Sequence, residues 1–73
     1  MYAWLMFSFK PYCERMKIQL LRDDLTFIEK CLQRIPVPRQ RKVMHEYTKI
    51  WLSEESQNIG RRKANDYLRE LVE

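Results

Sequence analysis

Apolar residues recur at a helical period in the first half of the chain. Between residues 16 and 35 they follow one another at alternating steps of three and four: Ile18, Leu21, Leu25, Ile28, Leu32 and Ile35. This spacing predicts an amphipathic helix over residues 16–35. Pro36 ends this helix, because proline lacks a backbone N–H and biases the residue before it away from helical angles. Three more apolar residues widen the stripe and predict packing against more than one neighbour: Leu20, Phe27 and Cys31.

Two further helices are predicted in the second half. The first covers residues 38–53 and begins with Pro38, whose missing N–H costs nothing in a first helical turn. The second covers residues 60–72 and has apolar residues at i, i+3, i+4, i+7 and i+8: Ala64, Tyr67, Leu68, Leu71 and Val72. A polar run separates the two helices. Asn58 in this run is the candidate N-cap of the last helix, and Gly60 is expected to ease the backbone into its first turn.

The first nine residues are almost wholly apolar. They are about half the length needed to cross a bilayer, and they lack the basic region and cleavage site of a signal peptide. They are expected to form a short helix or arm packed on the body, or a segment that contacts a partner through Trp4, Phe7 and Phe9. Another interpretation is that Met16 is the natural start of the protein.

These patterns predict an all-α fold, a small three-helix bundle with an additional short apolar N-terminal helix or arm. Residues 1–15 form the apolar N-terminal segment, and residues 16–73 form a single helical domain, because a chain of 73 residues allows one domain. The single glycine argues against a hairpin-rich β fold. The residues expected to be buried are Leu25, Ile28, Leu32, Tyr47, Ile50, Trp51, Leu68 and Leu71.

Positive charge is concentrated in one part of the chain. Residues 38–52 carry four cations and one anion, which is the largest local excess in a chain of net charge +4. A solvated helix face explains this excess, and contact with phosphate is the alternative. The predicted order of helix, short turn and helix is also that of a helix-turn-helix DNA-binding motif. In that motif the groove-facing end of the second helix would be Arg39, Gln40, Arg41 and Lys42. The turn Pro-Val-Pro differs from the usual glycine-containing one.

A second basic cluster, Arg61 to Lys63, opens the last predicted helix. Cations at a helix N-terminus cost only about 0.3–1 kcal/mol each, so their position is explained either by chance or by another use, such as contact with a phosphate or an acidic partner. In an antiparallel bundle the two clusters lie at opposite ends, so Arg39 and Lys42 are expected to matter more than Arg61 and Arg62. The candidate nucleic-acid contacts are Arg39, Gln40, Arg41, Lys42, Lys49, Arg61, Arg62 and Lys63.

The sequence contains few residues that could act in catalysis or metal binding. It contains one histidine, His45, and two cysteines, Cys13 and Cys31. Two cysteines without a second pair of ligands do not make a zinc site. Adjacent carboxylates on a helix diverge by about 100°, so they do not converge on one substrate as an acid/base pair. No catalytic residue, metal ligand, cofactor or small-molecule substrate is predicted. The cysteines are interpreted as reduced thiols in a cytoplasmic protein, and no membrane span is expected.

Part of the chain is similar to temperate-phage proteins. Residues 27–73 resemble a helical segment near the front of phage replication endonucleases and in small phage early-region proteins. The resemblance lies in four stretches, Phe27–Leu32, Ile35–Arg39, Glu46–Tyr47 and Gly60–Glu70, of which Arg62 to Asn65 with Tyr67 and Leu68 is the most specific. It implies a phage or prophage origin and a role near DNA replication. The endonucleases nick DNA with a metal-binding histidine pair and tyrosines, whereas this chain has one histidine, so the nicking activity is not implied.

Two hypotheses for function remain, and neither is an enzyme. The first is a small non-enzymatic phage or prophage accessory protein that acts near DNA replication or early-region regulation by binding nucleic acid or a replication protein. The alternative is a protein-interaction module, either an inhibitor of a host protein or a homodimer, that uses the apolar N-terminal segment. Salt dependence separates them, because affinity from phosphate contacts falls steeply with salt.

Overall fold

Four helices make up the described part of the chain. The structure, a computed structural model, describes residues 9–73. The helices are α1 (Phe9–Arg15), α2 (Arg22–Leu32), α3 (Val37–Leu52) and α4 (Gln57–Val72). These residues contain no strand, and the prediction of a small all-α bundle is confirmed. The short apolar N-terminal helix or arm was predicted from residues 1–9, of which residues 1–8 lie outside the described residues.

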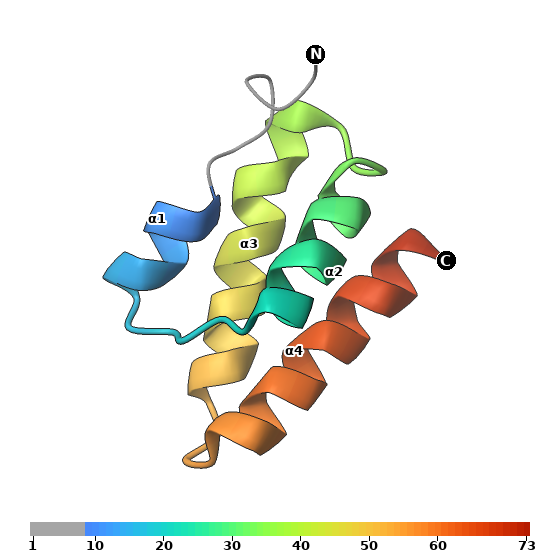
Figure 1. Cartoon of the computed structure of the whole chain (residues 1–73). Helices are drawn as coiled ribbons and strands as arrows, with labels where there is room; N and C mark the ends of the chain where they lie inside the picture. Colours follow the sequence, from blue (N-terminus) through green and yellow to red (C-terminus); the bar gives the residue numbers. More distant parts are fainter. Residues whose placement is uncertain (1–8) are drawn as a thin grey trace.

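The helices pack around α3. In Figure 1, α3 runs through the middle of the molecule, with α1 on one side of it and α2 and α4 on the other. Direct packing joins α3 to α4, α2 to α4 and α1 to α3. Because α4 starts where α3 ends, the first turns of α3 and α4 lie at opposite ends of the bundle (Figure 1).

The core is formed by side chains from all four helices and from the connection before α2. Among the predicted core residues, five are buried: Ile28, Leu32, Tyr47, Trp51 and Leu68. Leu25 and Ile50 are half-buried. The prediction for Leu71 is wrong, because this side chain is 48% exposed and lines an open hollow beside the start of α3.

The predicted helix over residues 16–35 is wrong at both ends. Its start lies in a helix-ending turn, where Lys17 has a left-handed φ of 63°. The N–H of Lys17 donates to the carbonyl of Glu14, and the N–H of Ile18 donates to that of Cys13, both at 3.0 Å. This pair of bonds is a Schellman motif that ends α1. Ile18 is therefore buried by a non-helical connection, although it fits the helical period.

A buried carboxylate starts α2 and fastens it to α4. The backbone N–H of Leu21 donates to Asp24 Oδ2 at 3.0 Å, where no side chain of Leu21 can cap the helix. Arg61 Nε donates to the same oxygen at 2.9 Å, and Asn65 Nδ2 donates to Oδ1 at 3.3 Å. Asn65 in turn accepts the hydroxyl hydrogen of Tyr47 at 2.7 Å. One network thus links α2, α3 and α4.

The turn between α3 and α4 differs from the prediction in two respects. The N-cap of α4 is Ser56 and not Asn58. The hydroxyl of Ser56 accepts a hydrogen bond from the N–H of Ile59. Gly60 lies inside α4 and is buried. A Cβ at this position would collide with the backbone carbonyl of Trp51. Glycine is therefore required here for the close approach of α4 to α3, and not for backbone freedom.

Candidate nucleic-acid interface

The exposed side of α3 carries the positive charge of the predicted interface. The helix buries one face against the bundle: Gln40, Val43, Met44, Tyr47, Thr48 and Trp51. The cations that remain exposed on the helix define its basic face: Arg39, Arg41, Lys42 and Lys49. They belong to one helix, so the fold brings together four of the eight predicted contacts.

Two hollows flank the basic face. The α4-side hollow has a volume of about 320 Å³, an apolar floor and three cations. Its apolar residues are Ile35, Pro36, Val43, Tyr67 and Leu71, and its charged residues are the cations Arg34, Arg39 and Lys42 and the carboxylate Glu46. Arg34 lies in the turn before α3, where the surrounding sequence has no charge excess, so composition gave no signal for it.

The α1-side hollow lies between α1 and α3. It has a volume of about 380 Å³ and is lined by Tyr12, Pro38, Arg41, Lys42 and His45. Tyr12 Oη lies 3.0 Å from His45 Nδ1. Lys42 lines both hollows, so they adjoin each other along α3.

The one carboxylate of α3 does little to neutralise the basic face. Glu46 Oε2 lies 3.6 Å from Lys49 Nζ, and both side chains are well exposed to solvent. Exposed ion pairs of this kind contribute only about 0–1 kcal/mol. Lys49 can therefore exchange Glu46 for another anion at little cost.

Gln40 does not belong to this surface. Its side chain is buried, and its amide nitrogen donates to the carbonyls of Leu32 at 2.9 Å and Ile35 at 3.0 Å. Leu32 is the last residue of α2, and its carbonyl also accepts from the N–H of Ile35 at 3.0 Å; Ile35 itself lies in the turn before α3. The prediction that Gln40 faces a groove is corrected, because the amide joins α2 to α3 instead.

The second basic cluster lies at the opposite end of the bundle, near the start of α4. Arg61 pairs with the buried Asp24, and its guanidinium carbon lies 5.1 Å from the centroid of the Trp51 ring. Lys63 Nζ lies 2.6 Å from Glu54 Oε2. Arg62 is exposed. Arg61 is unfavourably placed near a helix N-terminus, and Asp24 of the same chain is the acidic partner that offsets this cost.

Of the predicted partner-binding residues, only Phe9 is described. It is partly buried and packs against the hydrophobic core. Trp4 and Phe7 lie outside the described residues.

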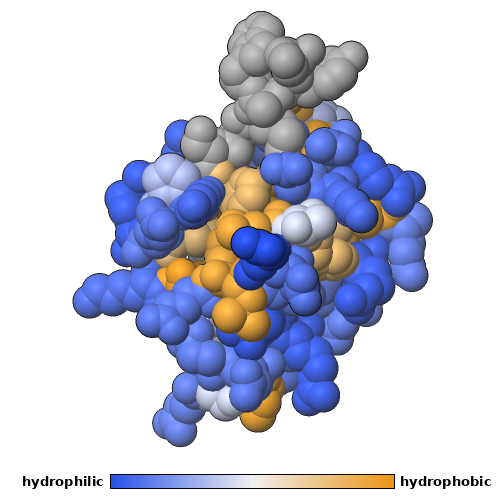
Figure 2. Space-filling model, in the orientation of Figure 1, coloured by the Kyte–Doolittle hydropathy of each residue, from blue (hydrophilic) through white to orange (hydrophobic). Residues whose placement is uncertain are grey.

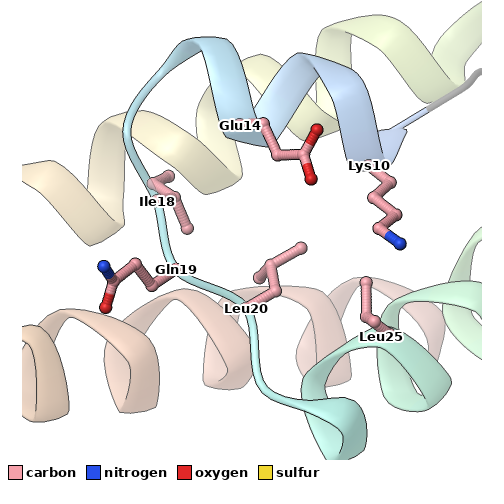
Figure 3. Close-up of a pocket in the computed structure, with 6 residues that line it drawn as sticks. All are labelled: Lys10, Glu14, Ile18, Gln19, Leu20 and Leu25. Atoms are coloured by element: carbon pink, nitrogen blue, oxygen red, sulfur yellow. The ribbon is translucent and has the colours of Figure 1, made fainter.

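An apolar hollow opens on the other side of α1. Figure 2 shows apolar atoms gathered in the middle of one face of the molecule, surrounded by polar ones. The hollow lies between α1 and α2, has a volume of about 280 Å³ and is lined by Lys10, Glu14, Ile18, Gln19, Leu20 and Leu25. Figure 3 shows Lys10 and Glu14 on α1, facing Leu20 of the connection and Leu25 of α2. Leu21, next to it in the sequence, is 56% exposed.

The thiols and the central tyrosine are unsuited to act as nucleophiles. Burial, with a smaller effect of Glu14, raises the pKa of the Cys13 thiol to about 11. Burial also raises the pKa of Cys31, against the lowering effect of Arg69 and Arg34. Burial and the nearby Asp24 raise the pKa of Tyr47. All three groups therefore remain protonated at neutral pH.

Residues 9–73 contain neither a cluster of metal ligands nor a membrane-spanning helix. No group of three or more His, Cys, Asp and Glu side chains in this range is placed to hold a metal ion. None of the helices in the range has the length and apolar character needed to cross a membrane.

Comparison with known proteins gave no match among protein-family models, curated proteins or solved structures. The candidate interface is therefore defined by its own geometry and charge.

Proposed function

We propose that the protein is a small non-enzymatic accessory module of phage or prophage origin, which acts in the cytoplasm near DNA replication or early-region regulation. In this proposal it binds nucleic acid through the basic face of α3. The observation that carries the proposal is the difference between the two basic clusters. Arg39 and Lys42 are exposed beside the α4-side hollow, whereas Arg61 and Lys63 already have carboxylate partners in the chain.

The contacts are expected to reach the phosphate backbone and not the base edges. Gln40 is the only amide side chain of α3, and its burial keeps it from reading an adenine. The flanking α1 and α4 also leave α3 without the projecting position of a recognition helix (Figure 1). Binding should therefore depend little on sequence.

The expected result is steeply salt-dependent binding to duplex DNA. With about three to four phosphate contacts, the slope of log affinity against log salt should lie between about −2.7 and −3.6, since each contact adds about −0.9. Fluorescence anisotropy with two unrelated duplexes of equal length, from about 50 to 200 mM salt, measures the slope and the sequence preference. Binding that is insensitive to salt, or absent throughout, would contradict the proposal.

A protein-interaction module is the second candidate, and the apolar hollow of Figure 3 favours it. Leu20 and Leu25 lie at an open surface next to the exposed Leu21. A host protein or a second copy of the chain could cover this surface. Self-association that persists at high salt, together with no affinity for DNA, would favour this candidate.

A further inference from the structure

The α4-side hollow combines an apolar floor with cations that have no anionic partner. Arg34, Arg39 and Lys42 line it. In the part of the chain that the structure describes, none of the three forms an ion pair or a side-chain hydrogen bond. The carboxylate that lines the hollow, Glu46, lies 3.6 Å from Lys49 Nζ. The hollow therefore keeps an excess of positive charge that a bound anion can neutralise.

The side of the hollow formed by α4 presents an aromatic ring and an exposed apolar side chain. Tyr67 contributes the ring and is half-buried. Burial and, to a smaller extent, the nearby Glu46 raise the pKa of the Tyr67 phenol, so the ring carries no charge that would repel an anion. Leu71, which is 48% exposed, follows four residues later and lies on the same face of α4. This arrangement suits a ligand that is anionic in one part and flat and apolar in another.

We propose that the α4-side hollow takes up an unpaired base of a single-stranded nucleic acid. The inference rests on the proposed function and deepens it, because Arg39 and Lys42 belong to the basic face of α3 and contact the phosphates beside that base. These two cations are three residues apart on the helix and so lie side by side. The base stacks on Tyr67 through its face, so the site distinguishes single strands from duplexes without reading the base edges.

The size and surroundings of the hollow favour a base over an acidic peptide. Its volume of about 320 Å³ is near the lower end of the range for ligand sites, about 300–1,000 Å³, and suits a single flat group. An aromatic ring beside a row of cations is also the arrangement by which proteins bind single strands. The positive charge continues from Lys42 to Lys49, two turns further along α3, and gives the backbone of a strand a path past the hollow.

Fluorescence anisotropy with the whole protein tests this site by comparing two labelled single strands of about eight nucleotides. One strand is oligothymidylate. The other has the same backbone with abasic residues, so the two strands carry the same charge. We expect the strand with bases to bind about tenfold more tightly, since stacking of one base contributes a factor of about this size. Equal affinities would overturn the inference.

Two substitutions test whether the preference arises in the hollow. Tyr67→Leu removes the ring and keeps an apolar side chain, so it should abolish most of the preference and leave the affinity for the abasic strand unchanged. Leu71→Ser should reduce the preference as well, and the exposure of Leu71 keeps this variant informative if Tyr67→Leu does not fold. Ile59→Ser is the control, because Ile59 is an apolar residue near the other end of α4 with a similar exposure of 39%. A preference that survives both Tyr67→Leu and Leu71→Ser would overturn the inference.

The outcomes separate this inference from the proposed function. If duplex DNA binds with the expected salt slope and the two single strands bind equally, the base site is wrong and the proposed function stands. If neither duplex nor single strand binds, the proposed function is wrong and the inference fails with it. If a peptide of glutamate and leucine with the same charge binds more tightly than oligothymidylate, and Leu71→Ser weakens it, the hollow belongs to an acidic protein partner and the inference is overturned.

Discussion

Replacement of Ile28 with alanine is expected to lower the free energy of unfolding by about 2–5 kcal/mol. Ile28 is fully buried in α2, within the cluster formed by the core side chains of all the helices. The substitution removes apolar contact and leaves a cavity that the surrounding helices fill only in part. Because a core of this size supplies only about 3–5 kcal/mol, much of the variant should be unfolded at room temperature. Chemical denaturation followed by far-UV circular dichroism measures the change.

Glu29→Ala is the matched control for Ile28→Ala. Glu29 is the next residue of the same helix and is exposed, so its loss should change the free energy of unfolding by less than about 0.5 kcal/mol. Should Ile28→Ala fail to fold, Ile28→Val should fold and lose about 0.5–1.5 kcal/mol. A change below about 0.5 kcal/mol for Ile28→Ala would place Ile28 on the surface and contradict the packing of α2.

Asp24→Ala is expected to cost about 3 kcal/mol of stability, near the lower end of values for broken buried ion pairs. The substitution removes the acceptor for the Leu21 N–H, for Arg61 and for Asn65. The side chain of Arg61 is 21% exposed, so water can hydrate the guanidinium in the variant and reduce the loss of stability. The free energy of unfolding from urea denaturation provides the measurement.

Asp23→Ala is the control for Asp24→Ala. Asp23 is the neighbouring carboxylate in the first turn of α2 and is exposed. Its removal sacrifices only a favourable interaction with the helix dipole, about 0.3–1 kcal/mol. Equal losses for the two variants would mean that Asp24 acts as a surface charge, and the link from α2 to α4 would then be wrong.

The sequence predicted the regular parts of the fold and failed at the ends of helices. The alternation of three and four located the core side of α2 through Ile28 and Leu32, and Pro36 marked the turn before α3. The end of α1 escaped prediction because Lys17 occupies a left-handed conformation that glycine usually adopts. Ile18 therefore keeps the helical spacing in the sequence while lying outside any helix.

The candidate interface was only partly readable from the sequence. The charge excess of residues 38–52 located the basic face of α3, because consecutive turns of one helix keep their residues together. Contacts between distant residues gave no such signal. Asp24 and Arg61 are 37 positions apart, and Tyr12 and His45 are 33 apart. Gln40 was misplaced because a polar residue type predicts exposure, whereas its amide is buried at the end of α2.

The central claim is that nucleic acid contacts the basic face of α3, and paired charge removal tests it most directly. Arg39→Ala with Lys42→Ala removes two exposed cations from this face. Lys30→Ala with Arg62→Ala removes two exposed cations from α2 and α4. This control variant therefore has the same net charge as Arg39→Ala with Lys42→Ala. Anisotropy titrations over a salt series compare the two variants with the unchanged protein.

The first variant should bind both test duplexes more weakly and to the same extent, with a salt slope reduced by up to about two units. The second variant should keep the slope of the unchanged protein to within about half a unit, since it loses no phosphate contact. Equal slopes for the two variants, or an unchanged slope in Arg39→Ala with Lys42→Ala, would contradict the assignment of the interface to α3.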